Sequence, residues 1–191
     1  MHDRSCDQTW SAQISRIFYR IRQFLRGFGA QVTAQEWAVV QAWLSPPEQA
    51  LFLRMPSDAQ HHSLEVLRTL ALKAPVPGEL GVAALLHDAG KVAARDAGAY
   101  LGLWMRGPIV IIEALTPTLL DELGSPVPSG SLRYALYVQR EHPAIGAEWA
   151  RQAGASELSC WLIEHHQDKQ VCGSIAQQTL LARLQWADGR N

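Results

Sequence analysis

The sequence predicts an all-α protein built mainly as a single helical bundle. Apolar residues recur at spacings of three and four along most of the 191 residues, and no segment shows the alternation with period two that is typical of a strand. Prolines and glycines divide the periodic stretches into segments of helical length. A chain of this length is long enough to bury one hydrophobic core.

Local signals place the helices along the chain. Ser45 before two prolines is a typical helix start, and Pro75 ends the helix that carries His61 and His62. The segment 124–130, GSPVPSG, is predicted to be a loop. The expected helices cover residues 14–28, 34–44, 46–53, 61–70, 78–86, 101–120, 132–138, 143–153, 157–165 and 175–186. We expect residues 1–45 to form an N-terminal helical extension and residues 46–191 the main domain.

Two of these helices raise the question of membrane contact. The helix over 14–28 is amphipathic, with arginines among its apolar positions, and we expect it to pack on the domain; a membrane surface or a partner is the alternative. The apolar stretch 101–120 contains Arg106, Pro108, Glu113 and Pro117, so it predicts a core helix and no transmembrane segment.

Composition and charge argue against a strongly nucleic-acid-binding, disulfide-rich or secreted protein. The formal net charge is −1, which gives no strong signal for nucleic-acid binding. The three cysteines are too scattered for a disulfide framework, and the N-terminus lacks the basic and then apolar order of a secretory signal. Reduced thiols and the missing signal predict a cytoplasmic protein.

The segment Ala83–Lys91 carries the strongest chemical signal. An apolar run ends in His87-Asp88 and is followed by Gly90 and Lys91. A neutral imidazole beside a carboxylate is a pair of metal ligands. Further candidate ligands lie at helical positions or helix ends, where side chains from several helices meet in a bundle. These are His62, His142, His165, His166 and Asp188, with His61 and Asp168 as weaker alternatives to His62 and Asp188.

The order of these residues resembles a known family. The set His62, His87-Asp88 and Asp188 is similar to the HD-domain superfamily of metal-dependent phosphohydrolases, and the likeness covers residues 58–188. His142 in EHPAIGAE and the pair His165-His166 resemble its binuclear branch, which includes the HD-GYP phosphodiesterases and dinucleoside polyphosphate hydrolases. The Gly-Tyr-Pro segment that follows the paired histidines in HD-GYP proteins is absent.

The resemblance implies two divalent metal ions, with iron or manganese favoured by the ligand types. It implies that Asp88 bridges them, that a metal-bound hydroxide attacks phosphorus, and that Lys91 balances phosphate charge. Asp58, one helical turn before His62, would orient that imidazole or assist with an extra metal ion. The implied ligand sets are His62, His87, Asp88 and Asp188 for one ion, and Asp88, His142, His165 and His166 for the other.

The sequence therefore predicts an enzyme that cleaves a phosphoester or phosphoanhydride in a nucleotide or other small phosphorylated metabolite. Two alternatives stay open. One is a mononuclear, nucleotidase-like HD enzyme that uses only His62, His87, Asp88 and Asp188. The other is a metal-binding signalling or scaffold domain without turnover. The sequence does not indicate the substrate, the native metal or the oligomeric state.

Overall fold

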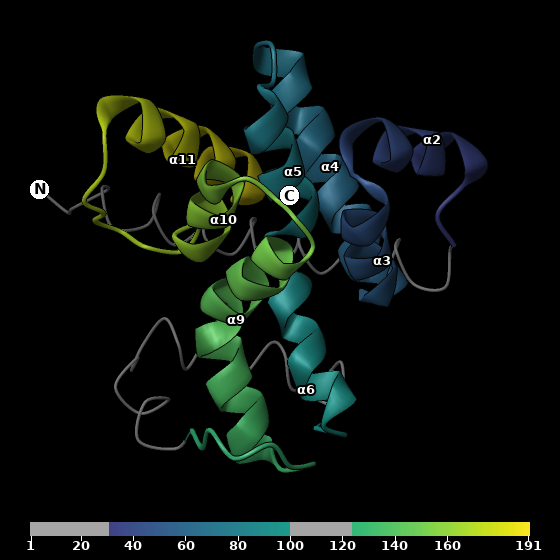
Figure 1. Ribbon diagram of the computed structural model, residues 1–191, viewed down its shortest axis with the longest axis vertical. Coiled ribbons are helices and arrows are strands. Elements are labelled where there is room, and N and C mark those ends of the chain that lie inside the picture. Colours follow the sequence, from purple (N-terminus) through teal and green to yellow (C-terminus); the bar gives the residue numbers. More distant parts are fainter. Residues whose placement is uncertain (1–30, 100–123) are drawn as a thin grey trace, which may run out of the picture.

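The computed structural model describes residues 31–99 and 124–191, which form helices joined by short connections (Figure 1). The all-α prediction is confirmed, since these two ranges contain no strand. The predicted helices over 14–28 and 101–120 lie outside the described residues. The observed elements are α2 (Ala34–Trp43), α3 (Pro46–Arg54), α4 (Ser57–Lys73), α5 (Gly78–Leu86), the 3₁₀ turn η1 (Ala89–Lys91), α6 (Val92–Asp96), α9 (Leu132–Gln152), α10 (Glu157–Glu164) and α11 (Ile175–Asp188).

The helix starts follow from local chemistry. At the predicted start of α3, the backbone N–H of Ser45 donates to Glu48 Oε2 at 2.7 Å, and the two residues form a capping box. Thr33 and Glu36 form the same motif at α2. Each box satisfies N–H groups that the first turn of a helix leaves without a carbonyl partner. These polar caps explain why helix starts could be located from the sequence.

Helix α5 lies at the centre of the bundle and packs against α2, α3, α4, α10 and α11 (Figure 1). Most of its side chains are apolar and fully buried, which is typical of a helix surrounded by others. At Gly81 the helix packs closely on Trp43, since an added Cβ would lie 2.1 Å from the Trp43 ring. The helix ends at Leu86, so His87 and Asp88 follow it directly into the interior of the bundle.

Helix α9 differs from the prediction. The sequence predicts two helices, 132–138 and 143–153, with His142 before the second, but residues 132–152 form one continuous helix with Pro143 inside it. The prediction of a break is therefore wrong. Proline removes one backbone N–H, and the carbonyl of Gln139 that this N–H would have bonded receives the Nδ1–H of His142 at 2.7 Å. The packing of α9 against η1 and α10 stabilises the rest of the helix.

The main core extends across the domain boundary that the sequence suggested at residue 45. Val40 of α2 and Leu44 belong to the same buried cluster as the side chains of α3, α4 and α5. A smaller cluster lies where α6 meets α9 and includes Ala93, Tyr134 and Val138. The division at residue 45 stays a prediction, because residues 1–30 lie outside the described residues.

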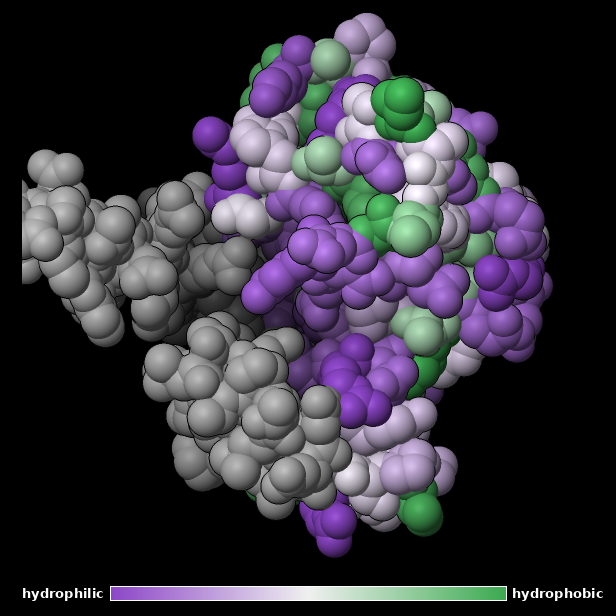
Figure 2. All heavy atoms as spheres, turned by 90° about the vertical axis from the view of Figure 1, so that its left-hand side faces the viewer, coloured by the Kyte–Doolittle hydropathy of each residue, from purple (hydrophilic) through white to green (hydrophobic). Residues whose placement is uncertain are grey.

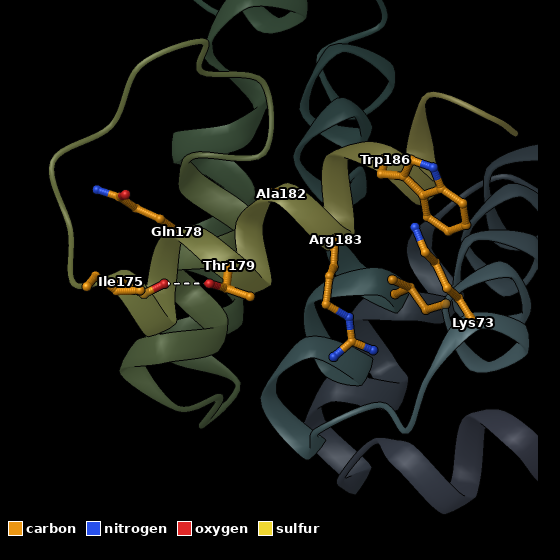
Figure 3. Close-up of a pocket in the computed structure, with 8 residues that line it drawn as sticks. Lys73, Ile175, Gln178, Thr179, Ala182, Arg183 and Trp186 are labelled. Atoms are coloured by element: carbon orange, nitrogen blue, oxygen red, sulfur yellow. Dashed lines mark hydrogen bonds between the residues drawn. The ribbon is translucent and has the colours of Figure 1, made fainter.

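The described part of the chain exposes few large hydrophobic side chains: Leu53, Leu72, Val127, Leu132 and Ile175. Figure 2 shows one face, on which hydrophobic residues occur singly or in small groups. The described part of the chain contains no helix that is both long and apolar enough to cross a membrane. A groove of about 690 Å³ lies between α4 and α11, where the Lys73 ammonium sits 4.0 Å from the centre of the Trp186 ring (Figure 3). None of the residues that line this groove is a predicted site residue.

Candidate metal centre

The turn after α5 positions the first two site residues. His87 and Asp88 are 1% and 7% exposed, and at Asp88 the backbone (φ −96°, ψ 1°) leaves the α-helix and enters η1. The turn then packs directly on α9: a Cβ at Gly90 would lie 2.1 Å from the carbonyl oxygen of His142. Gly146 of α9 also faces this turn, and a Cβ there would lie 3.1 Å from the Gly90 nitrogen. The two glycines thus allow the approach that brings Asp88 beside His142.

Four imidazoles from four parts of the bundle form a row. His62 comes from α4, His87 follows α5, His166 follows α10 and His142 lies in α9. Their ring centroids are separated by 5.3 Å between His62 and His87, 5.1 Å between His87 and His166, and 5.2 Å between His166 and His142. The fold therefore gathers residues that are up to 104 positions apart in the sequence (166 minus 62).

One carboxylate lies beside each half of this row. Asp188, the last residue of α11, places Oδ1 2.9 Å from His62 Nε2 and 3.7 Å from His87 Nε2. Asp88 Oδ1 lies 3.4 Å from His142 Nε2 and 3.9 Å from His166 Nε2. The residues form two groups, His62–His87–Asp188 and Asp88–His142–His166, and within each group the ligand atoms lie within 4.8 Å of one another. Asp88 Oδ1 also lies 3.8 Å from His87 Nε2, which links the groups.

The hydrogen bonds of the histidines fit a bound cation. His87 Nδ1 lies 3.0 Å from the carbonyl oxygen of Ala84, and His166 Nδ1 lies 2.7 Å from that of Ile163. A carbonyl only accepts, so each Nδ1 carries a hydrogen, and in the neutral ring Nε2 keeps its lone pair. Both Nε2 atoms are buried and have no hydrogen-bond partner among the described residues. Buried polar atoms rarely stay unpaired, and a divalent metal ion is a suitable partner for these lone pairs.

The electrostatics of the group Asp88–His142–His166 favour the protonation states that bind a metal ion. Burial alone raises the pKa of the Asp88 carboxyl, but the Lys91 ammonium, 2.7 Å from Oδ1, and the His87 imidazole hold this pKa well below its usual value. Burial and the neighbouring His87 and His142 rings lower the pKa of His166 to about 3. Burial also lowers the pKa of His142. At neutral pH the group around Asp88 therefore offers a carboxylate and the neutral imidazoles of His142 and His166, the forms that bind metals.

In the group His62–His87–Asp188, the pKa values of Asp188 and His87 are set by burial and by the charged side chains around them. Burial opposes ionisation of Asp188, yet its hydrogen bond with His62 and the nearby His87 imidazole lower the pKa of the carboxyl. Burial lowers the pKa of His87, but the attraction of Asp88 and Asp188 outweighs it and the pKa is raised overall. Two negative carboxylates next to buried imidazoles create a local preference for positive charge, which a metal ion satisfies.

The remaining predicted site residues lie around the two groups. Lys91 contacts both oxygens of Asp88, at 2.7 and 2.8 Å. Asp58 lies in the first turn of α4, on the helix that carries His62, and belongs to neither group. His165 also belongs to neither: its Nδ1 is 2.7 Å from Asp168 Oδ2, and its ring lies 4.7 Å from that of Trp161. Thus the structure turns the two adjacent histidines to different surroundings.

Three residues that line or support the candidate metal centre were not identified from the sequence. Gln167 Nε2 lies 3.4 Å from His142 Nε2, at the edge of the centre. Gln185, three residues before Asp188, donates to the carbonyl oxygen of Asp168 at 2.8 Å and so ties α11 to the turn after α10. Gly146 lies one helical turn after His142, a spacing that marks a shared helix face and could have indicated its role. The two glutamines had no comparable signal.

Comparison with known proteins agrees with this geometry. The family model described as HD domain matches residues 60–188. This range runs from α4 to the last residue of α11 and contains all members of both ligand groups. No curated protein and no solved structure matches the chain significantly. The extent of the family match, together with the His-Asp centre, shows that the chain belongs to the HD domain family, in the superfamily of metal-dependent phosphohydrolases.

Proposed function

We propose that this protein is an enzyme that holds two divalent metal ions and hydrolyses a phosphoester or phosphoanhydride bond in a nucleotide or other small phosphorylated metabolite. The observation that carries the proposal is the meeting of two three-residue ligand groups at one carboxylate, Asp88. A pair of adjacent divalent ions is suited to phosphoryl chemistry. Family membership supports the metal-dependent hydrolytic class.

The proposed ligands are the six residues of the two groups. When bound, divalent ions there lower the pKa of a water molecule and neutralise charge on phosphate oxygens. Mixed imidazole and carboxylate ligands suit iron or manganese. The proposed ligand residues are His62, His87 and Asp188 on one side, and Asp88, His142 and His166 on the other.

Lys91 and Asp58 complete the proposed site. The Lys91 side chain is 39% exposed and reaches Asp88 from the solvent side, so its ammonium is available to a phosphate that approaches from there. Lys91 would then share its charge between the Asp88 carboxylate and the substrate. Asp58, on the same face of α4 as His62, is proposed to orient that histidine.

Metal content and hydrolysis test the proposal together. We expect about two ions per chain by elemental analysis of protein purified without chelator, and hydrolysis of members of a panel of phosphodiesters, phosphomonoesters and nucleotides. One ion with hydrolysis would favour the mononuclear alternative, in which Asp88 joins His62, His87 and Asp188. Bound metal without turnover of any panel member would favour the signalling or scaffold alternative. No metal, even after incubation with manganese or iron, would contradict all three.

A paired substitution tests which of the adjacent histidines is a ligand. His166→Ala is expected to remove the ion held with Asp88 and His142, because the Nε2 of His166 is buried and aimed at that group. His165→Ala is expected to leave the metal content unchanged, because its ring is bonded to Asp168 instead. Elemental analysis of both variants checks this, with circular dichroism to confirm folding. Loss of an ion in His165→Ala would restore the ligand role that the family resemblance implied.

A further inference from the structure

The three most buried histidines of the centre are oriented in the same way. The Nδ1 of His87, His142 and His166 lies 3.0, 2.7 and 2.7 Å from the carbonyl oxygen of the residue three positions earlier. This bond fixes both the ring orientation and the tautomer, and it leaves Nε2 directed at the carboxylates. A carbonyl can orient a ring in this way most readily when no backbone N–H competes for it.

For two of the histidines the end of a helix provides the open carbonyl. His87 follows α5 and bonds to Ala84, and His166 follows α10 and bonds to Ile163. Both acceptors lie in the last turn of their helices, where carbonyls have no N–H partner within the helix. His142 differs, because it lies inside the 21-residue helix α9, where each carbonyl would normally accept from the N–H four residues later.

The acceptor for His142 is Gln139, and the residue four positions after Gln139 is Pro143. Proline has no backbone N–H, so the normal donor to this carbonyl does not exist. We propose that Pro143 is a positioning residue for the metal centre: by leaving the Gln139 carbonyl open inside a continuous helix, it gives His142 the same orienting bond that helix ends give to His87 and His166. His142 is fully buried, with Nε2 3.4 Å from Asp88 Oδ1.

The proposed role explains why a proline stands inside α9, which helix stability alone does not explain. Proline inside a helix removes a backbone bond and crowds the carbonyl four residues before it, so it destabilises the helix. An ordinary residue at position 143 would strengthen α9 but would bring an N–H into competition with the His142 ring for one carbonyl. The proposal therefore predicts opposite effects of the same substitution on the helix and on the histidine.

The test compares Pro143→Ala with a variant that carries lactic acid, the hydroxy analogue of alanine, at position 143. Alanine restores the N–H, whereas the ester lacks both the N–H and the proline ring. In Pro143→Ala we expect the His142 imidazole of the metal-free protein to lose its uniform Nδ1–H tautomer, as read by ¹H–¹⁵N correlation spectra. The melting temperature should be equal or higher, and Mn²⁺ should bind about tenfold more weakly. The ester variant should retain the native tautomer and Mn²⁺ affinity.

Pro47→Ala is the matched control, because Pro47 lies in the first turn of α3, where a backbone N–H has no intrahelical acceptor. It should leave the tautomer and the Mn²⁺ affinity unchanged. An unchanged His142 tautomer in Pro143→Ala would overturn the proposal. An ester variant that behaves like the alanine variant would also overturn it, because the proline ring, and not the missing N–H, would then be responsible. The affinity change rests on the proposed function; the tautomer does not. A wild-type protein that fails to bind Mn²⁺ would therefore contradict the function and leave the orientation measurable.

Discussion

Asp88→Asn is expected to abolish hydrolysis and to reduce the metal content to at most one ion per chain. Asp88 is the only carboxylate in its ligand group, and its Oδ1 lies within 3.9 Å of the Nε2 atoms of His87, His142 and His166. Asparagine keeps the shape of the side chain but removes the negative charge. Charge stabilisation by a metal ion is worth several kcal/mol, and about 1.4 kcal/mol is a factor of ten, so the rate should fall at least about a hundredfold.

Elemental analysis and the hydrolysis panel measure this prediction, and thermal melting shows that the variant is folded. Asp96→Asn is the matched control. Asp96 forms an ion pair with Arg54 at 2.7 Å, but both side chains are more than 40% exposed and lie outside the ligand groups. The control should keep wild-type metal content and activity. If Asp88→Asn retained two ions and full turnover, the assignment of Asp88 as the shared ligand would be wrong.

Gly90→Ala is expected to destabilise the protein strongly and to disrupt the metal centre. The added Cβ would lie 2.1 Å from the His142 carbonyl oxygen and 2.7 Å from the Gly146 nitrogen. Both are backbone atoms, so no side chain can rotate away, and η1 must move relative to α9. Such overpacking costs about 3 kcal/mol, which is about 6–12 °C in melting temperature for a chain of this length. Because η1 directly follows Asp88, we also expect loss of the ion held with His142.

Gly78→Ala provides the comparison for Gly90→Ala. Gly78 begins α5, and a Cβ there would meet nothing within 4 Å. This variant should therefore melt at or above the wild-type temperature, since alanine favours the helix. Differential scanning calorimetry of both variants, with and without Mn²⁺, separates the packing effect from metal loss. Wild-type stability and metal content in Gly90→Ala would show that the close approach between η1 and α9 is not required.

The helix positions followed from the sequence to the extent that local chemistry determines them. The start of α3 was predicted from Ser45 and its prolines, and α5 was predicted at the observed residues 78–86. The break at Pro143 was predicted by the same local rules and is absent. Packing of α9 against η1 and α10, and the side chain of His142, compensate there for the missing backbone donor. Both depend on residues distant in the chain or on a side-chain conformation, which a local pattern does not contain.

The candidate site likewise combines residues that local sequence patterns indicate with contacts that only packing determines. The His87-Asp88 pair was identified because an apolar helix leads into it, and His62, His142 and Asp188 because their order resembles the HD pattern. The choice between His165 and His166 could not be made locally, because both follow the same helix and only the packing of α10 decides which ring is buried. The proximity of Gly90 to the His142 carbonyl likewise depends on how two separate elements pack.

The contact between His62 and Asp188 joins residues 126 positions apart at 2.9 Å. An ion held by both would act on the unfolded chain as a cross-link does, by removing the conformations in which these ends are far apart. In the chain-entropy description, closing a loop of about 100 residues is worth about 4.7 kcal/mol, comparable to the whole stability of many domains. Metal supply would then determine how long each molecule survives cellular proteolysis, in addition to whether it is active.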